Sequence, residues 1–156
     1  MSVGQGHVFG NVPGTTLPSL WGSDTIKMIL CTNSITPSTS DTGPRYGSGG
    51  STNYTTSEVA AGGNYNTGGI SVTTSSSQSS NVFSLTATSP ISLSANASNP
   101  TGVYYGVFYD SSDANKRCLG WIDLSSGSGI STVSGLQVNL NGVASGTQPV
   151  FQSTST

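Results

Sequence analysis

Few side chains in this sequence could take part in chemistry. His7 is the only histidine, and it stands in a Gly-rich stretch without a second group to orient it, as a triad or a metal site requires. Asp110 and Asp113 could offer two carboxylates to a hard cation such as Ca²⁺, but a complete site needs six to eight oxygen ligands. Asp and Ser also close turns by bonding their own backbone, so we expect a turn at 110–113 and a contact role for His7.

The remaining acidic residues do not form a recognisable catalytic pair. Asp24, Asp41, Glu58 and Asp123 lie in different segments, and no spacing favours two of them as the carboxylates of a glycosidase. The Gly-rich stretch 61–69 lacks both the G-x-G-x-x-G spacing and the P-loop lysine, which excludes a phosphate cradle. The sequence therefore predicts a protein that is not an enzyme and that uses no cofactor or metal.

Cys31 and Cys118 stand far apart and form no CxxC pair. They are most simply two small buried apolar residues, since free cysteine behaves as a small hydrophobe. A disulfide between them, or a metal or catalytic role, stays open.

The charge of the chain limits its partners. Only 6% of the residues are charged, the formal net charge is −2, and Lys27, Arg45, Lys116 and Arg117 are the only lysines and arginines. No basic face exists to neutralise a phosphate backbone, so nucleic acid is not expected as a partner. No apolar run approaches the length of a membrane span, and the first 20 residues do not resemble a signal peptide, so we expect a soluble, unprocessed chain with no membrane partner.

Short β segments separated by Gly, Ser, Asn and Pro dominate the pattern, and no helical stretch is convincing. The range 103–109 is apolar on both faces and is the best candidate for a central strand. The Ser/Thr run 71–80 predicts a polar edge strand or hairpin, and 34–52 predicts a long surface loop. These features predict an all-β fold, a single β-sandwich or jelly-roll-like domain. Strands are expected at 24–31, 55–60, 69–74, 81–87, 90–94, 102–109, 118–123 and 135–140.

We divide the chain into an extended N-terminal arm (1–23), a β-sandwich domain (24–145) and an extended C-terminal tail (146–156). The arm has neither a helical nor a two-residue period, yet its apolar side chains need a surface to cover them. They pack either on their own domain or on a neighbour. As partner-binding anchors we select Val8, Phe9, Leu17, Leu20, Trp21, Val150 and Phe151.

Four segments together resemble small structural proteins of tailed bacteriophages that decorate or cement the head. The first is Asp24-Thr-Ile-Lys-Met-Ile-Leu30 with Ile35-Thr-Pro37, and the second is 57–65 with Gly68-Gly69. The third is 103–109 running into Leu119-Gly-Trp-Ile-Asp-Leu124, and the fourth is 136–140. The resemblance covers roughly residues 24–145, whereas residues 1–23 are longer and richer in Gly and Pro than the start of such proteins.

The resemblance implies a structural virion protein without enzymatic activity. Such a capsid decoration (cement) protein binds the outer head surface, bridges neighbouring major capsid subunits and is commonly a homotrimer. It implies a location on the capsid surface after synthesis in the host cytoplasm. The alternative is a phage tail, fibre or receptor-binding module that recognises host glycans through its tyrosines, although packing in the core is the simpler role for tyrosines within strands.

Overall fold

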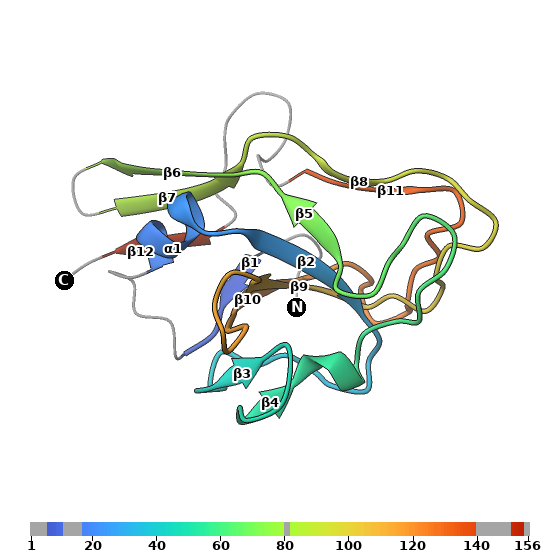
Figure 1. The fold of residues 1–156 in the computed structure, drawn as a ribbon. Helices are drawn as coiled ribbons and strands as arrows, with labels where there is room; N and C mark the ends of the chain where they lie inside the picture. Colours follow the sequence, from blue (N-terminus) through green and yellow to red (C-terminus); the bar gives the residue numbers. More distant parts are fainter. Residues whose placement is uncertain (1–5, 11–16, 80–81, 140–150, 155–156) are drawn as a thin grey trace.

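A computed structural model describes residues 6–10, 17–79, 82–139 and 151–154, with the backbone alone given for 17–18, 77–79, 82–85 and 151–154. The described elements are almost entirely β-strands arranged in several mostly antiparallel sheets, which confirms the all-β fold class. Figure 1 shows these sheets together with the one short α-helix of the described residues.

A five-stranded antiparallel sheet forms the centre of the molecule. Its order is β1 (Gly6–Val8), β10 (Cys118–Asp123), β9 (Tyr105–Asp110), β2 (Ile26–Cys31) and β5 (Ile70–Val72). The predicted central strand thus lies in the middle of the sheet. Five of the six residues of β9 and all six of β10 are buried, as expected for strands covered on both faces.

Three smaller sheets surround the central one. A three-stranded sheet has the order β12 (Phe151–Thr154), β7 (Val82–Ala87) and β6 (Thr74–Ser79), and β8 (Ile91–Leu93) pairs with β11 (Leu136–Val138). β3 (Pro44–Arg45) and β4 (Thr52–Asn53) form a short parallel pair. Because β6 is an edge strand joined to β7 as a hairpin, the prediction for the Ser/Thr run is confirmed.

Different layers cover the two faces of the five-stranded sheet. Phe108 and Tyr109 are consecutive in β9 and so point to opposite faces. Trp21 of α1 (Leu17–Ser23) contacts Phe108, with ring centroids 5.6 Å apart, whereas Tyr46 stacks on Tyr109 at 4.5 Å. In Figure 1 the pair β3–β4 accordingly lies on one side of the sheet, and β6 and β7 lie on the other.

The prediction of a strand at 55–60 is wrong. The chain forms a 3₁₀ helix, η1 (Tyr54–Thr56), which Asn53 caps by accepting a hydrogen bond from the Thr55 N–H at 3.1 Å. The following residues then run beside β2, where β5 no longer pairs with it: Val59 N donates to the Leu30 carbonyl at 2.9 Å. The cap, a local side-chain effect, outweighs the β pattern.

The helix α1 also differs from the expectation that no stretch is helical. It has only seven residues, too few to show a helical period in the sequence. Pro18 stands in its first turn, where the missing N–H removes no helical hydrogen bond. Burial of Trp21, rather than helix propensity, accounts for this element.

Candidate functional site

The N-terminal segment forms the edge strand of its own sheet. β1 pairs with β10 in an antiparallel register that sets Gly6 opposite Ile122. Phe9 follows β1, is 1% exposed, and lies against Trp121 and Tyr54 with ring centroids 4.7 and 5.7 Å away. Its backbone N–H donates to the Leu119 carbonyl at 3.2 Å.

Trp21 anchors the second part of the segment. Its side chain is fully buried, and its indole N–H donates to the Thr86 carbonyl of β7 at 2.9 Å. The ring thereby joins the five-stranded sheet to the three-stranded one. Phe9 and Trp21 are therefore core residues of their own domain in this fold and offer no surface to a neighbour.

The other predicted anchors have different positions. Val8 and Leu20 are half-buried against the same core, so part of each side chain is accessible. Leu17 begins α1, and Phe151 begins β12 opposite Leu85, but the side chains of both lie outside the description. Val150 lies outside the described residues. The structure brings Val8, Phe9, Leu20 and Trp21 onto one core, and a partner role for the segment stays a prediction.

His7 stacks on Trp121, with ring centroids 5.1 Å apart. Each ring has a buried nitrogen without a hydrogen-bond partner among the described residues, Nε2 of His7 and Nε1 of Trp121. This contact fixes β1 on β10 through ring packing.

The β9–β10 loop is the turn that the sequence predicts. One carboxylate oxygen of Asp110 accepts hydrogen bonds from the backbone N–H groups of Ser112 and Asp113 at 2.9 and 3.1 Å, and from the Ser112 hydroxyl at 2.6 Å. Asp113 accepts from the Asn115 N–H and lies 3.6 Å from the Arg117 guanidinium. No group of three or more metal-ligating side chains occurs among the described residues.

A partly buried network around Glu58 cannot be recognised in the sequence. The hydroxyls of Tyr46 and Tyr65 donate to its two carboxylate oxygens at 2.7 and 2.8 Å, and the Gly68 N–H donates at 2.8 Å. Gly69, next in the chain, needs its φ of +82° and lies directly against the Met28 carbonyl, where a side chain would not fit. Glu58 therefore fastens the 44–69 segment to β2.

The tyrosine hydroxyls of this network stay neutral. Tyr65 also accepts a hydrogen bond from the Leu30 N–H at 3.0 Å, and Tyr109 donates to the Gly68 carbonyl at 2.9 Å. Burial, followed by the negative charge of Glu58, raises the pKa of Tyr109 to about 12. Burial likewise raises the pKa of Tyr46 and Tyr65 well above the usual tyrosine value. The network is a set of protonated donors around one carboxylate.

Both cysteines are buried free thiols, as expected for small apolar residues. Burial and the charge of Glu58 raise the pKa of Cys31 well above its ordinary value, and burial does the same for Cys118. A thiol held neutral in this way is a poor nucleophile and metal ligand.

All six carboxylates of the chain accept a hydrogen bond from a group of the same chain. Asp41 accepts from the Gly43 N–H and the Ser51 hydroxyl, Asp123 from the Ser125 N–H at 2.9 Å, and Asp24 from the Ser23 hydroxyl at 3.0 Å. Together with Asp110, Asp113 and Glu58 they complete the acidic residues of the sequence. The acidic groups thus stabilise loops and turns of their own fold.

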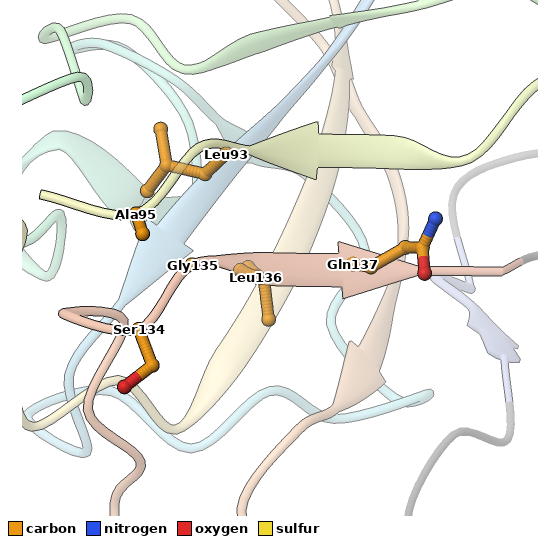
Figure 2. Close-up of a pocket in the computed structure, with 6 residues that line it drawn as sticks. All are labelled: Leu93, Ala95, Ser134, Gly135, Leu136 and Gln137. Carbon is orange, nitrogen blue, oxygen red and sulfur yellow. The ribbon is translucent and has the colours of Figure 1, made fainter.

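A contrasting region surrounds β8 and β11. We call residues 88–105 and 124–139 the neutral region, because they include no Asp, Glu, Lys or Arg. A shallow hollow of about 310 Å³ lies in it, and Figure 2 shows the residues that line this hollow. Its lining residues are Leu93, Ala95, Ser134, Gly135, Leu136 and Gln137. The uncharged stretches of the sequence extend well beyond this region, over 59–109 and 124–156, so they do not by themselves mark a site.

Comparison of the chain with known protein families, with curated proteins and with solved structures gives no match. Among the described residues, no helix is long and apolar enough to cross a membrane. The inference of function therefore depends on the residues and geometry described above.

Proposed function

We propose that this chain is a decoration (cement) protein of a tailed-bacteriophage head. In this proposal it binds the outer capsid surface, bridges neighbouring major capsid subunits and acts as a homotrimer on the virion after synthesis in the host cytoplasm. It is a structural protein and catalyses no reaction.

The observation that carries the proposal is the placement of the segments that resemble such proteins. The 24–30 segment contributes β2, 103–109 contributes β9, and 119–124 contributes most of β10, so the three are neighbours in the central sheet. The 57–65 segment lies beside them through the bridge between Cys31 and Glu58. Three of the four segments thus form one contiguous unit, which supports the proposal, whereas the fourth contributes β11 of a separate two-stranded sheet.

The use of the carboxylates supports a structural role. General acid–base or metal chemistry needs carboxylates that are directed at a substrate or an ion. Here all six accept hydrogen bonds from their own chain, four of them from the N–H groups of turns that they close, at Asp41, Asp110, Asp113 and Asp123. A cement protein needs a rigid body and broad contacts rather than such a centre, and many identical weak contacts on a lattice add through effective concentration.

The test uses full-length protein and capsids freed of accessory proteins. We expect the protein to co-sediment with these capsids and to raise the temperature at which they open. Deletion of residues 1–23 is unsuitable as a variant, because it removes the core side chains of Phe9 and Trp21.

A point substitution can test the N-terminal segment instead. Ser19 is exposed on α1 beside the half-buried Leu20, and Ser89 is exposed between β7 and β8. If α1 contacts the capsid, Ser19→Arg weakens binding whereas the control Ser89→Arg does not. Failure of the wild-type protein to bind any capsid would overturn the proposed function.

One observation keeps a glycan-binding module as the second candidate. Four of the six tyrosines are buried, but Tyr104 and Tyr105 are half-exposed with ring centroids 6.3 Å apart. Exposed aromatic rings can stack on sugars. This function predicts saturable binding of a host glycan by the isolated protein and its loss in Tyr104→Ala.

A further inference from the structure

The turn between β9 and β10 carries a lysine where the backbone favours a smaller residue. Lys116 has a φ of +46°, and its N–H donates to the Asp113 carbonyl at 2.9 Å to close the turn. Gly is favoured at the fourth residue of such a turn, and Asn also tolerates the left-handed region. The Lys116 side chain is exposed, so burial in the core does not offset this strain. The fold alone therefore does not account for a lysine here, and residues strained in this way cluster at functional sites.

Two arginines flank Lys116. Arg117 follows it in the chain and forms an isolated bridge with Arg45 of β3, and the Tyr46 N–H donates to the Lys116 carbonyl at 2.9 Å. Figure 1 accordingly shows the β9–β10 turn beside β3. Three of the four basic residues of the sequence thus meet at one edge of the molecule. We call Arg45, Lys116 and Arg117 the cationic cluster.

The guanidinium of Arg45 is held in place by its own chain. Its Nη1 donates to the side-chain oxygen of Asn115 at 3.2 Å. The stem of the side chain passes so close to Gly50 that a Cβ atom there would lie 2.9 Å from Arg45 Cγ, and Nη1 lies against Gly49. A guanidinium has five N–H donors, and in the described part of the chain Arg45 uses one of them. A side chain fixed in this way loses less entropy when it binds a partner.

The acidic side chains near the cationic cluster are occupied by their own fold. Asp113 lies 3.6 Å from Arg117, in the single ion pair of the described residues, but its side chain is only 17% exposed. Asp110 is 3% exposed and accepts the N–H groups of the turn, and Glu58 accepts the three hydrogen bonds of its own network. The carboxylates are thus used internally, whereas the cations keep donors for a partner.

These donors favour carboxylates as ligands. The Nζ atom of Lys116 lies 5.5 Å from the centroid of the Tyr46 ring, but it has no ion pair in the described part of the chain. Arginine binds a carboxylate through paired N–H donors, and it is among the residues that carry most of the binding energy at protein interfaces. A nucleic-acid backbone needs a basic face much larger than three side chains. An acidic protein surface is therefore the partner that this chemistry fits.

We propose that the cationic cluster is the surface through which this chain binds carboxylate groups on an acidic protein partner. This inference rests on the proposed function, in which the partner surface is the outer face of the capsid. Arg45 supplies a positioned set of donors, and Lys116 and Arg117 add two charges next to it. Binding then weakens as salt is added, because exposed ion pairs are screened.

The first variant is Lys116→Asn, which removes a charge and suits the backbone. Asn tolerates a φ of +46° better than Lys does, so we expect an unfolding free energy at least equal to that of the wild type. Co-sedimentation with capsids freed of accessory proteins measures affinity. We expect at least tenfold weaker binding in 50 mM NaCl, and a smaller further loss in 500 mM NaCl than the wild type shows. A less stable variant would show that the fold requires Lys116, which contradicts the inference.

A matched pair of Ala-to-Glu substitutions tests the position of the contact. Ala114 is exposed in the β9–β10 turn, and Ala97 is exposed in the loop that follows β8. Ala114→Glu should bind capsids at least tenfold more weakly, whereas Ala97→Glu should bind as the wild type does. Near-ultraviolet circular dichroism reports whether each variant keeps its packed aromatic core. If folded Lys116→Asn and Ala114→Glu both bind as tightly as the wild type, the inference is wrong and the proposed function stands.

A second probe separates the inference from the proposed function. The probe is poly-L-glutamate, and heparin serves as a sulfated comparison. A wild type that binds polyglutamate, with loss in Lys116→Asn, but binds no capsid keeps the inference and overturns the function. Binding to neither overturns both. Preference for heparin over polyglutamate would overturn the assignment of carboxylates as the ligand.

Discussion

Two regions of the molecule fasten long loops with one polar side chain each, and they use opposite chemistry. Glu58 is a charged acceptor that gathers two tyrosine hydroxyls and a backbone N–H around its carboxylate. Asn99 is neutral and serves as donor and acceptor at once, entirely to backbone groups. The chain thus places a carboxylate where tyrosine hydroxyls donate to it, and it uses an uncharged amide for the same purpose in the neutral region.

The largest effect is expected from Glu58→Ala. The substitution leaves the hydroxyls of Tyr46 and Tyr65 and the Gly68 N–H without their acceptor, at a cost of about 3 kcal/mol of unfolding free energy. Urea unfolding measures it.

Glu58→Gln is the matched control. Its carbonyl oxygen can still accept from Tyr65 and Gly68, and its NH₂ group can donate to the Tyr46 hydroxyl, so we expect a loss of only about 1 kcal/mol. Equal losses in the Ala and Gln variants would show that charge, not hydrogen bonding, holds this loop.

Asn99→Ala should cost about 2 kcal/mol, because the buried Thr132 carbonyl, the partly buried Ser94 carbonyl and the Asn64 N–H lose their partner. Asn99→Asp is nearly isosteric but sets an oxygen against the carbonyls of Ser94 and Thr132. We therefore expect Asn99→Asp to be the less stable of the two at pH 7 in urea unfolding. An Asp variant as stable as the wild type would contradict this role of the uncharged amide.

The unfolding free energy should depend on alkaline pH through the network around Glu58 and not through the hydrogen bonds of Asn99. The pKa of Tyr109 is raised to about 12, so the stability that it contributes is complete below about pH 10, the value for an unfolded chain, and is lost as the pH rises toward 12. Tyr109→Phe should flatten the fall of unfolding free energy in this window by about 1.4 kcal/mol per pH unit. Asn99→Ala should lower the whole curve without changing its slope, and a change of slope there would contradict the assignment.

The smallest effect is expected at the surface. The ion pair between Asp113 and Arg117 is long, at 3.6 Å, and the Arg117 side chain is 39% exposed. Arg117→Gln should cost less than about 1 kcal/mol, and 1 M NaCl should remove most of the difference. A cost equal to that of Glu58→Ala would show that the turn, rather than the Glu58 network, limits stability.

The sheet could be predicted from the sequence better than the loops could. Enough β-branched and aromatic residues occur in β2, β7, β9 and β10 for the sequence to predict a strand at each of them. The bounds of β10 are those predicted. The strand expected at 55–60 failed because Asn53 caps a 3₁₀ turn there. A cap of this kind depends on one side chain, whereas the β pattern averages over several.

The Glu58 network was beyond prediction for a different reason. Tyr46, Glu58, Tyr65 and Tyr109 follow no period, and only the folding of the 44–69 segment over β2 and β9 brings them together. The sequence favours Phe9 and Trp21 as anchors because the 1–23 segment shows no hydrophobic period, and its apolar side chains need a surface to cover them. Their burial depends on strands that come later in the sequence.

The pairing of β1 with β10 also has a kinetic consequence. Gly6 and Ile122 are opposite one another, yet almost the whole domain separates them along the chain. During synthesis the first strand leaves the ribosome long before its partner exists, so the central sheet cannot be completed until β10 has emerged. Contacts of such high sequence separation slow folding, and we expect closure of this edge to be a late step in the maturation of each new copy.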